Sequence, residues 1–178
     1  LLNEGVHIDA SSFFEVDRAV SAGFTMDQIL LTSQRPLTPD QVREYSAQGL
    51  NINACSLHQL DTYGKYSPDK LVSVRINPGL GSGHSERTNV GGPGSPFGIW
   101  REDIQEGKGL VRQHGLEVVR IHTHIGSGSD PEVWEKVAEM SMGYLDTFPS
   151  ATILNLGGGF YVGRMHDEES TDLQAIGA

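Results

Sequence analysis

Two histidines and a serine follow an apolar run, and they make this the part of the chain best suited to chemistry. His122 and His124 stand two residues apart at the end of the run 117–125, and Ser127 follows after one glycine. Imidazole groups can stack on rings, exchange protons or bind metal ions. A second apolar run, 151–156, ends in the glycines Gly157, Gly158 and Gly159. Chemistry placed just after successive strands is typical of an α/β barrel enzyme, whose βα loops build the active site.

The elements that must position these residues alternate between β-rich and helical runs, which favours a parallel sheet wrapped by helices. The expected strands are 6–10, 28–33, 51–56, 70–77, 117–125 and 151–156. One helix is well marked: Thr38 can cap it, Pro39 suits its first turn and Gly49 ends it. Six strands fall short of the eight that close a barrel, and a complete barrel needs about 250 residues. We therefore expect residues 1–178 to form one part-barrel domain without its first and last strands.

Alternation along the strands predicts which side chains share the inside of the barrel, because residues two apart point to the same face. In the run 117–125, the residues expected under the helices are Val119, Ile121, Thr123 and Ile125. The residues expected to point inward are Arg120, His122, His124, Ser73, Arg75, Asn77, His7 and Asp9. This inward set is too polar for ordinary core packing, since buried charges need partners or a ligand. Either the charges pair with one another or the set binds a ligand.

Composition excludes several other classes of protein. The net charge of −10 and the pI near 5.0 argue against nucleic acid or an anionic membrane as the main partner. No apolar run approaches the roughly 18 residues of a membrane span, and the N-terminus lacks a signal-peptide pattern. Cys55 is the only cysteine, so no intrachain disulfide forms, which fits a cytoplasmic protein. The loop 78–96, rich in Gly, Ser and Pro, is either a lid or a surface excursion.

Five motifs occur in order along the chain: HIDAS, VRINPG, a Gly-His loop followed by SPFG, HTHIGSG and LNLGGGF. With these motifs the chain resembles the pyridoxal-phosphate-dependent decarboxylases with an alanine-racemase-type barrel, from about Gly5 to Gly159. The resemblance implies a (β/α)8 TIM-type barrel, a C-terminal β domain outside this chain, and pyridoxal 5'-phosphate as cofactor. The motifs are most similar to those of members that convert meso-diaminopimelate to L-lysine in lysine biosynthesis. Related members act on ornithine, arginine or carboxynorspermidine.

The resemblance also implies roles for individual residues. His124 stacks on the pyridine ring of the cofactor, and the cofactor phosphate binds to Ser127, Gly157, Gly158 and Gly159. Arg75 orients the acidic residue that bonds the pyridine nitrogen, and Asp9 lies at the cofactor-bearing end of the barrel. His122 supports His124 from within the barrel. Members of the family are typically homodimers that act on a small amino acid.

The lysine that carries the cofactor is the largest departure from the family pattern. The family's lysine lies on the first barrel strand, upstream of Leu1, and further catalytic motifs lie beyond Ala178. The lysines present are Lys65, Lys70, Lys108 and Lys136, none of which matches it. We therefore expect residues 1–178 alone to be inactive. A smaller departure is Pro96, where the family often has lysine.

Three other interpretations remain open from the residues. His122 and His124 also resemble the metal-binding histidine pair of barrel hydrolases, although the Gly-triplet strand offers no further ligand. A small barrel that carries pyridoxal phosphate without decarboxylase activity would keep the same motifs. A purely structural fragment would bind no cofactor at all.

Overall fold

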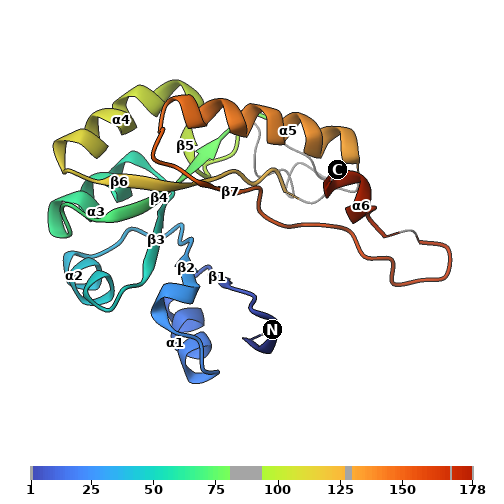
Figure 1. Ribbon diagram of the computed structural model, residues 1–178, viewed down its shortest axis with the longest axis horizontal. Coiled ribbons are helices and arrows are strands. Elements are labelled where there is room, and N and C mark those ends of the chain that lie inside the picture. Colours follow the sequence, from blue (N-terminus) through green and yellow to red (C-terminus); the bar gives the residue numbers. More distant parts are fainter. Residues whose placement is uncertain (1, 81–93, 127–129, 169, 178) are drawn as a thin grey trace.

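The computed structural model describes residues 2–80, 94–126, 130–168 and 170–177, and strands alternate with helices along most of the chain (Figure 1). The strands are β1 (Ile8–Ala10), β2 (Ile29–Leu31), β3 (Asn51–Ala54), β4 (Leu71–Asn77), β5 (Ile99–Trp100), β6 (Glu117–His122) and β7 (Ile153–Asn155). The α-helices are α1 (Phe13–Ser21), α2 (Pro39–Ala47), α3 (Leu57–Tyr66), α4 (Ile104–Gln113), α5 (Pro131–Gly143) and α6 (Leu173–Gly177). Short 3-10 turns lie at Leu2–Glu4, Met26–Gln28, Arg101–Asp103 and Tyr144–Asp146.

The strands form one parallel sheet in the order β1-β2-β3-β4-β6-β7, with helices packed along its outer side (Figure 1). All six expected strands are present, although each is shorter than its predicted run, and together they form part of a barrel. The sequence did not predict β5, which is two residues long and pairs with the carboxyl end of β4. Because every pair is parallel, the carboxyl ends of the strands meet at one edge of the sheet.

Helix α2 begins and ends where the sequence predicts. The side chain of Thr38 accepts a hydrogen bond from the backbone N–H of Gln41, and the Gln41 side chain in turn accepts from the N–H of Thr38. Pro39 occupies the first turn, where its missing N–H costs nothing. Gly49 follows the helix with φ = +87°, a left-handed conformation that glycine adopts without strain. These local signals set the ends of the helix that connects β2 to β3.

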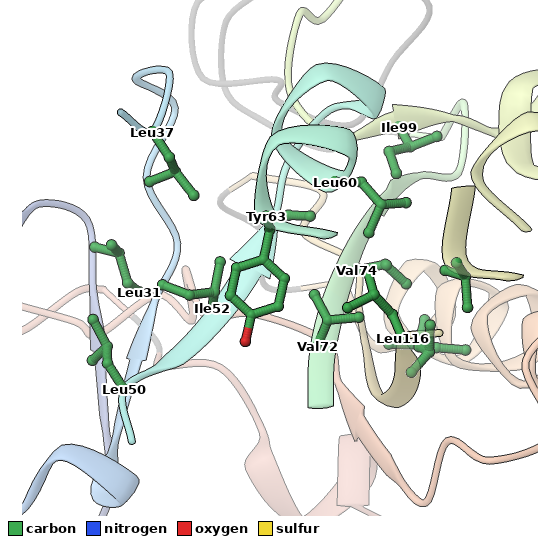
Figure 2. Packing of buried hydrophobic residues seen from close by; sticks show 14 of the residues in the cluster. Leu31, Leu37, Leu50, Ile52, Leu60, Tyr63, Val72, Val74, Ile99 and Leu116 are labelled. Atoms are coloured by element: carbon green, nitrogen blue, oxygen red, sulfur yellow. The ribbon is translucent and has the colours of Figure 1, made fainter. Parts of the chain in front are cut away.

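The main core lies between the sheet and the helices α1 to α4. Val72 and Val74 of β4 are each 1% exposed and pack toward α3 and α4, as strand alternation predicts. Figure 2 shows Leu60 and Tyr63 of α3 over the sheet, with Ile52 of β3 beside them. The hydroxyl of Tyr63 reaches the edge of this core and donates to the backbone carbonyl of Leu71. Apolar burial therefore covers the outer face of the sheet and leaves the inner face to polar side chains.

The register between β4 and β6 corrects one detail of the predicted alternation. Val72 pairs with Val118, but Ser73 pairs with Arg120, so Val119 is an extra residue in β6. The buried outward position therefore belongs to Val118, which is 1% exposed, rather than to Val119, which is half-buried. Such a bulge shifts the inward and outward alternation of the strand by one residue, so the residues after Val119 face the sides that the sequence predicted. Ile121 and Thr123 are accordingly fully buried on the outer side, as expected.

A second small core joins the end of β6 to α5. Ile125, Trp134 and Val137 are almost fully buried against one another, and the ring of Phe160 lies 4.7 Å from that of Trp134. This packing holds the segment after β6, which carries His124, against a helix. Among the described residues, no helix is long and apolar enough to cross a membrane.

Candidate active site

A cleft of about 490 Å³ opens at the carboxyl ends of the strands. The residues that line it are Asp9, Ser11, Thr32, Gln34, Arg75, Phe97, His122, His124, Gly157 and Gly158. Apart from Phe97, which precedes β5, they come from the ends of β1, β2, β4, β6 and β7, so the fold gathers residues that lie up to 149 positions apart in the sequence. This is the edge of the sheet where barrel enzymes place their active sites. The predicted inward residues Asp9, Arg75, His122 and His124 thus share one cleft.

His124 lies just beyond β6, with its imidazole against the glycine turn that follows β7. A Cβ atom added to Gly157 would overlap His124 Nδ1 and lie 2.9 Å from its Cγ. Nδ1 itself is buried and has no hydrogen-bond partner in the described part of the chain. Burial, and then the nearby charge of Arg75, lower the pKa of His124 to about 4. His124 is therefore a neutral, flat side chain at neutral pH.

His122 is the deeper of the two histidines and is only 4% exposed. Its Nδ1 lies 2.6 Å from the side-chain nitrogen of Asn53, on β3. Burial is the main cause that lowers the pKa of His122 to about 3, and the charge of Arg75 adds to it. The two imidazole centroids are 6.4 Å apart, so the rings do not stack on each other. Both histidines are therefore uncharged at neutral pH.

Asp9 connects the two edges of the part-barrel. Its carboxylate accepts a hydrogen bond from Thr32 Oγ1 at 2.5 Å and another from the Asn155 side-chain amide at 3.3 Å. Burial raises the pKa of Asp9, while these two hydrogen bonds and the charges of Arg120 and Arg75 act in the opposite direction. Asp9 is thus an acceptor held in place by β2 and β7.

Arg75 is a buried cation, 7% exposed, whose guanidinium lies 5.3 Å from the ring centre of Phe97. Burial lowers the pKa of Arg75, and interaction with Cys55 and Asp9 partly offsets that effect. The same burial raises the pKa of the Cys55 thiol to about 11, so Cys55 is a neutral neighbour rather than a nucleophile. Among the described residues that line the cleft, Arg75 and Asp9 are the charged side chains, and Asp9 also interacts with Arg120 outside the lining.

The glycine turn after β7 presents backbone rather than side chains to the cleft. Gly157 and Gly159 have φ values of +77° and +99°, which suit glycine. The N–H of Gly157 donates to the Asn155 side chain at 2.8 Å. Gly157 and Gly158 line the cleft, but Gly159 is exposed and is not among the lining residues. Ser127, the other predicted phosphate ligand, lies outside the described residues.

The cofactor that the resemblance implies fits this arrangement. The cleft has the size of a small-molecule site, for which volumes of about 300–1,000 Å³ are typical. Glycine at position 157 avoids the collision that a side chain there would make with His124, and backbone N–H groups at glycine turns bind phosphate. The site fits a metal ion less well, because no group of three or more His, Cys, Asp or Glu side chains that could bind one is present among the described residues.

Comparison with known proteins places the chain in a family. A family model for the pyridoxal-binding domain of pyridoxal-dependent decarboxylases matches residues 1–177. The chain is 42% identical over 139 residues to a diaminopimelate decarboxylase of Streptomyces coelicolor, which covers 76% of this chain and 32% of that protein. It is 34% identical over 176 residues to the diaminopimelate decarboxylase of Escherichia coli K12, which covers 96% and 42%.

Solved structures agree with the sequence matches. A crystal structure of diaminopimelate decarboxylase superimposes with a TM-score of 0.88 at 34% identity, over 97% of this chain and 42% of that one. An arginine decarboxylase of Paramecium bursaria Chlorella virus has the same fold, with a TM-score of 0.79 at 24% identity, over 98% of this chain and 47% of that one. The chain spans less than half the length of each of these proteins.

Proposed function

Because the chain belongs to the pyridoxal-dependent decarboxylases, we propose that residues 1–178 supply the cofactor-binding part-barrel of an enzyme that converts meso-diaminopimelate to L-lysine and CO2. The observation that carries the proposal is the cleft in which neutral His124 rests on Gly157 beside the buried cation Arg75. The named relatives support the choice of substrate. The alternatives are ornithine, arginine and carboxynorspermidine.

The protein's own residues have separable tasks in this proposal. Pyridoxal phosphate, when bound, supplies an electron sink for the electron pair left behind by departing CO2. His124 offers an uncharged, flat face to the pyridine ring. Gly158, together with Gly159 and Ser127, holds the phosphate through backbone N–H groups and a hydroxyl, while Gly157, whose N–H already donates to Asn155, supports His124 beside it.

The charged residues set the electrostatics of the cleft. Arg75 is held rigidly by burial and by Phe97, so it is suited to orient a carboxylate that approaches the pyridine nitrogen. Asp9 balances part of this positive charge at the same end of the barrel. The carbon that loses CO2 must take up a proton, and neither histidine carries a spare one at neutral pH. We infer that the proton donor is a group outside the described part of the chain.

A lysine to carry the cofactor must also come from elsewhere. Lys65, Lys70, Lys108 and Lys136 are all in described segments, and none of them lines the cleft. Residues 1–178 alone therefore bind the cofactor at most without a covalent bond and do not decarboxylate the substrate. As the resemblance implies, we propose that the complete protein is a cytoplasmic homodimer.

The test is a titration of the full-length protein with pyridoxal phosphate, followed by addition of meso-diaminopimelate. We expect an absorbance band of the bound cofactor that shifts when substrate is added, together with release of one CO2 for each L-lysine formed. Ornithine and arginine serve as matched controls under the same conditions. The chain 1–178 alone, treated in the same way, is expected to release no CO2.

Each outcome is informative. CO2 release from ornithine or arginine, but not from diaminopimelate, would keep the cofactor and reassign the substrate. A cofactor band without CO2 from any of these amino acids would identify a pyridoxal-phosphate carrier without this activity. Absence of any cofactor band would contradict the proposal altogether.

A further inference from the structure

A chain of hydrogen bonds runs through the inside of the part-barrel from Asp9 to His122. Thr32 Oγ1 donates to Asp9, and the side-chain nitrogen of Asn53 lies 3.1 Å from Thr32 Oγ1. The same nitrogen lies 2.6 Å from Nδ1 of His122. The chain thus crosses from β1 through β2 and β3 to β6. Asn53 and His122 are almost fully buried, at 1% and 4% exposed.

The number of hydrogens on each group determines which atom donates in each of these hydrogen bonds. An ionised carboxylate only accepts hydrogen bonds, so the single hydroxyl hydrogen of Thr32 must point at Asp9. Thr32 Oγ1 can then only accept from Asn53, which requires the NH2 group of Asn53 to face Thr32. The second hydrogen of that NH2 group points to His122, whose Nδ1 must be the unprotonated, accepting nitrogen.

We propose that Asp9, Thr32 and Asn53 together fix His122 as the neutral tautomer with its proton on Nε2, so that this ring presents a hydrogen-bond donor to the cleft. Thr32 and Asn53 are positioning residues in this arrangement, because they act through His122. Since His122 lines the cleft and its Nδ1 is occupied, Nε2 is the nitrogen left for a ligand.

The reverse arrangement is disfavoured by the same contacts. With the amide of Asn53 turned over, its oxygen would accept from a protonated Nδ1 and would also face Thr32. The single hydrogen of Thr32 would then have to serve both Asn53 and Asp9, which leaves two acceptors in close contact. Only a protonated Asp9 would relieve that conflict. Burial raises the pKa of Asp9, while its hydrogen bonds with Thr32 and Asn155 and the charges of Arg120 and Arg75 oppose that shift and favour the ionised form. With the NH2 group of Asn53 facing Thr32 and His122, one acceptor, Asn53 Oδ1, has no partner among the described residues.

The consequence for the ligand rests on the proposed function. A neutral donor can bond an acceptor atom of cofactor or substrate without adding charge beside Arg75. It cannot act as a general acid at neutral pH, because burial and Arg75 keep the pKa of His122 near 3. His122 would therefore orient a bound molecule rather than transfer a proton to it.

The test records which ring nitrogen of His122 carries the proton. The full-length protein is deuterated and labelled with 15N in its histidine rings, and long-range 1H–15N correlation spectra are recorded without substrate. The His122→Gln variant identifies the signal of His122. Spectra of the wild type are compared with those of the variants Asn53→Asp, Thr32→Val and Thr32→Ser.

We expect the Nε2–H tautomer in the wild type and in Thr32→Ser, which keeps the hydroxyl group. Free imidazole already favours this tautomer, so the variants are the sharper test. Asn53→Asp replaces the donor by an acceptor and should move the proton of His122 to Nδ1 or leave both nitrogens protonated. Thr32→Val releases the amide of Asn53 and should shift the tautomer ratio by about three- to tenfold toward Nδ1–H, the factor that corresponds to one hydrogen bond.

A wild-type ring with its proton on Nδ1, or a charged ring at pH 7, would overturn the inference. So would a ring of unchanged tautomer in folded Asn53→Asp, with circular dichroism as the check on folding. Because no substrate is present, these results are independent of decarboxylation. A protein with the expected tautomer that releases no CO2 would retain this inference and lose the proposed function.

Discussion

Gly157 packs against the imidazole of His124, with no room for a side chain between them, since an added Cβ atom would overlap Nδ1. One residue follows β6 and the other follows β7, so this contact joins two neighbouring strand ends at the cleft. The adjacent Gly158 differs, because a Cβ atom there would meet nothing within 4 Å. Packing therefore requires glycine at position 157 and leaves space for a side chain at position 158.

Gly157→Ala should destabilise the full-length protein and weaken cofactor binding, because the new methyl group pushes on His124 and the backbone has φ = +77°. The left-handed conformation alone costs about 1–2 kcal/mol for an L-residue. Gly158→Ala is the matched control and should change stability by no more than about 0.5 kcal/mol. Thermal unfolding measures both variants, and cofactor titration measures the loss of affinity in Gly157→Ala. Equal melting temperatures for the two variants would contradict the role of the contact.

Acid should destabilise the cofactor-free protein through its buried histidines. The pKa of His124 is lowered to about 4 in the folded state, against 6.5 for an ordinary histidine, so below pH 6.5 the unfolded state binds more protons. The free energy of unfolding should therefore fall as the pH drops from 6.5 toward 4. His124→Gln should flatten this fall by about 2 kcal/mol, allowing for partial solvent contact. Denaturant midpoints at several pH values measure it, and parallel curves for wild type and variant would refute the expected linkage.

Asp9 should have the opposite dependence on pH. Burial raises the pKa of this carboxyl, so the folded state keeps its proton to higher pH than the unfolded state does. The free energy of unfolding therefore loses a contribution as the pH rises above the ordinary value of 3.8. Asp9→Asn should raise the melting temperature at pH 7 by about 1–3 °C, with little difference near pH 3.5, while weakening activity. A variant that melts lower than the wild type at pH 7 would show that the carboxylate contributes more through its hydrogen bonds than it costs by burial.

The fold was predictable from the sequence to the extent that local signals determine it. Apolar alternation located the six barrel strands, and the Thr38 cap with Gly49 bounded α2. The strand β5 was missed because two residues, Ile99 and Trp100, carry no periodicity. The extra residue Val119 was missed because a bulge depends on the register with β4, which no local pattern encodes.

The candidate site was predictable only for residues with a motif. Asp9, Arg75 and His124 were placed in one cleft by alternation and by resemblance, and they do share it. Asn53 and Asn155 were overlooked, although a polar residue inside a predicted strand was a visible signal. Their partners could not be predicted, since the contact of Asn155 with Asp9 joins strands at opposite ends of the sheet order.

The residue between the two histidines provides a last test of how the site is held. Thr123 is fully buried, and its Oγ1 lies 2.9 Å from Oγ of the equally buried Ser141 on α5. Ser141 Oγ in turn donates to the carbonyl of Val137, so Thr123 must be the donor of the pair. Removal of the acceptor should then cost more than removal of the donor, since it leaves a buried hydroxyl hydrogen without a partner.

We expect Thr123→Val to lower the free energy of unfolding by about 0.5–1.5 kcal/mol, because it conserves volume and loses one hydrogen bond. Ser141→Ala should lower it by about 1–3 kcal/mol. The double variant should lose less than the sum of the two, with a coupling of at least about 0.5 kcal/mol, because the orphaned hydroxyl is gone. Strict additivity in this cycle, measured by denaturant unfolding, would mean that the two hydroxyls do not interact. Since Thr123 separates His122 from His124, coupling would show that α5 anchors the strand end that carries both histidines.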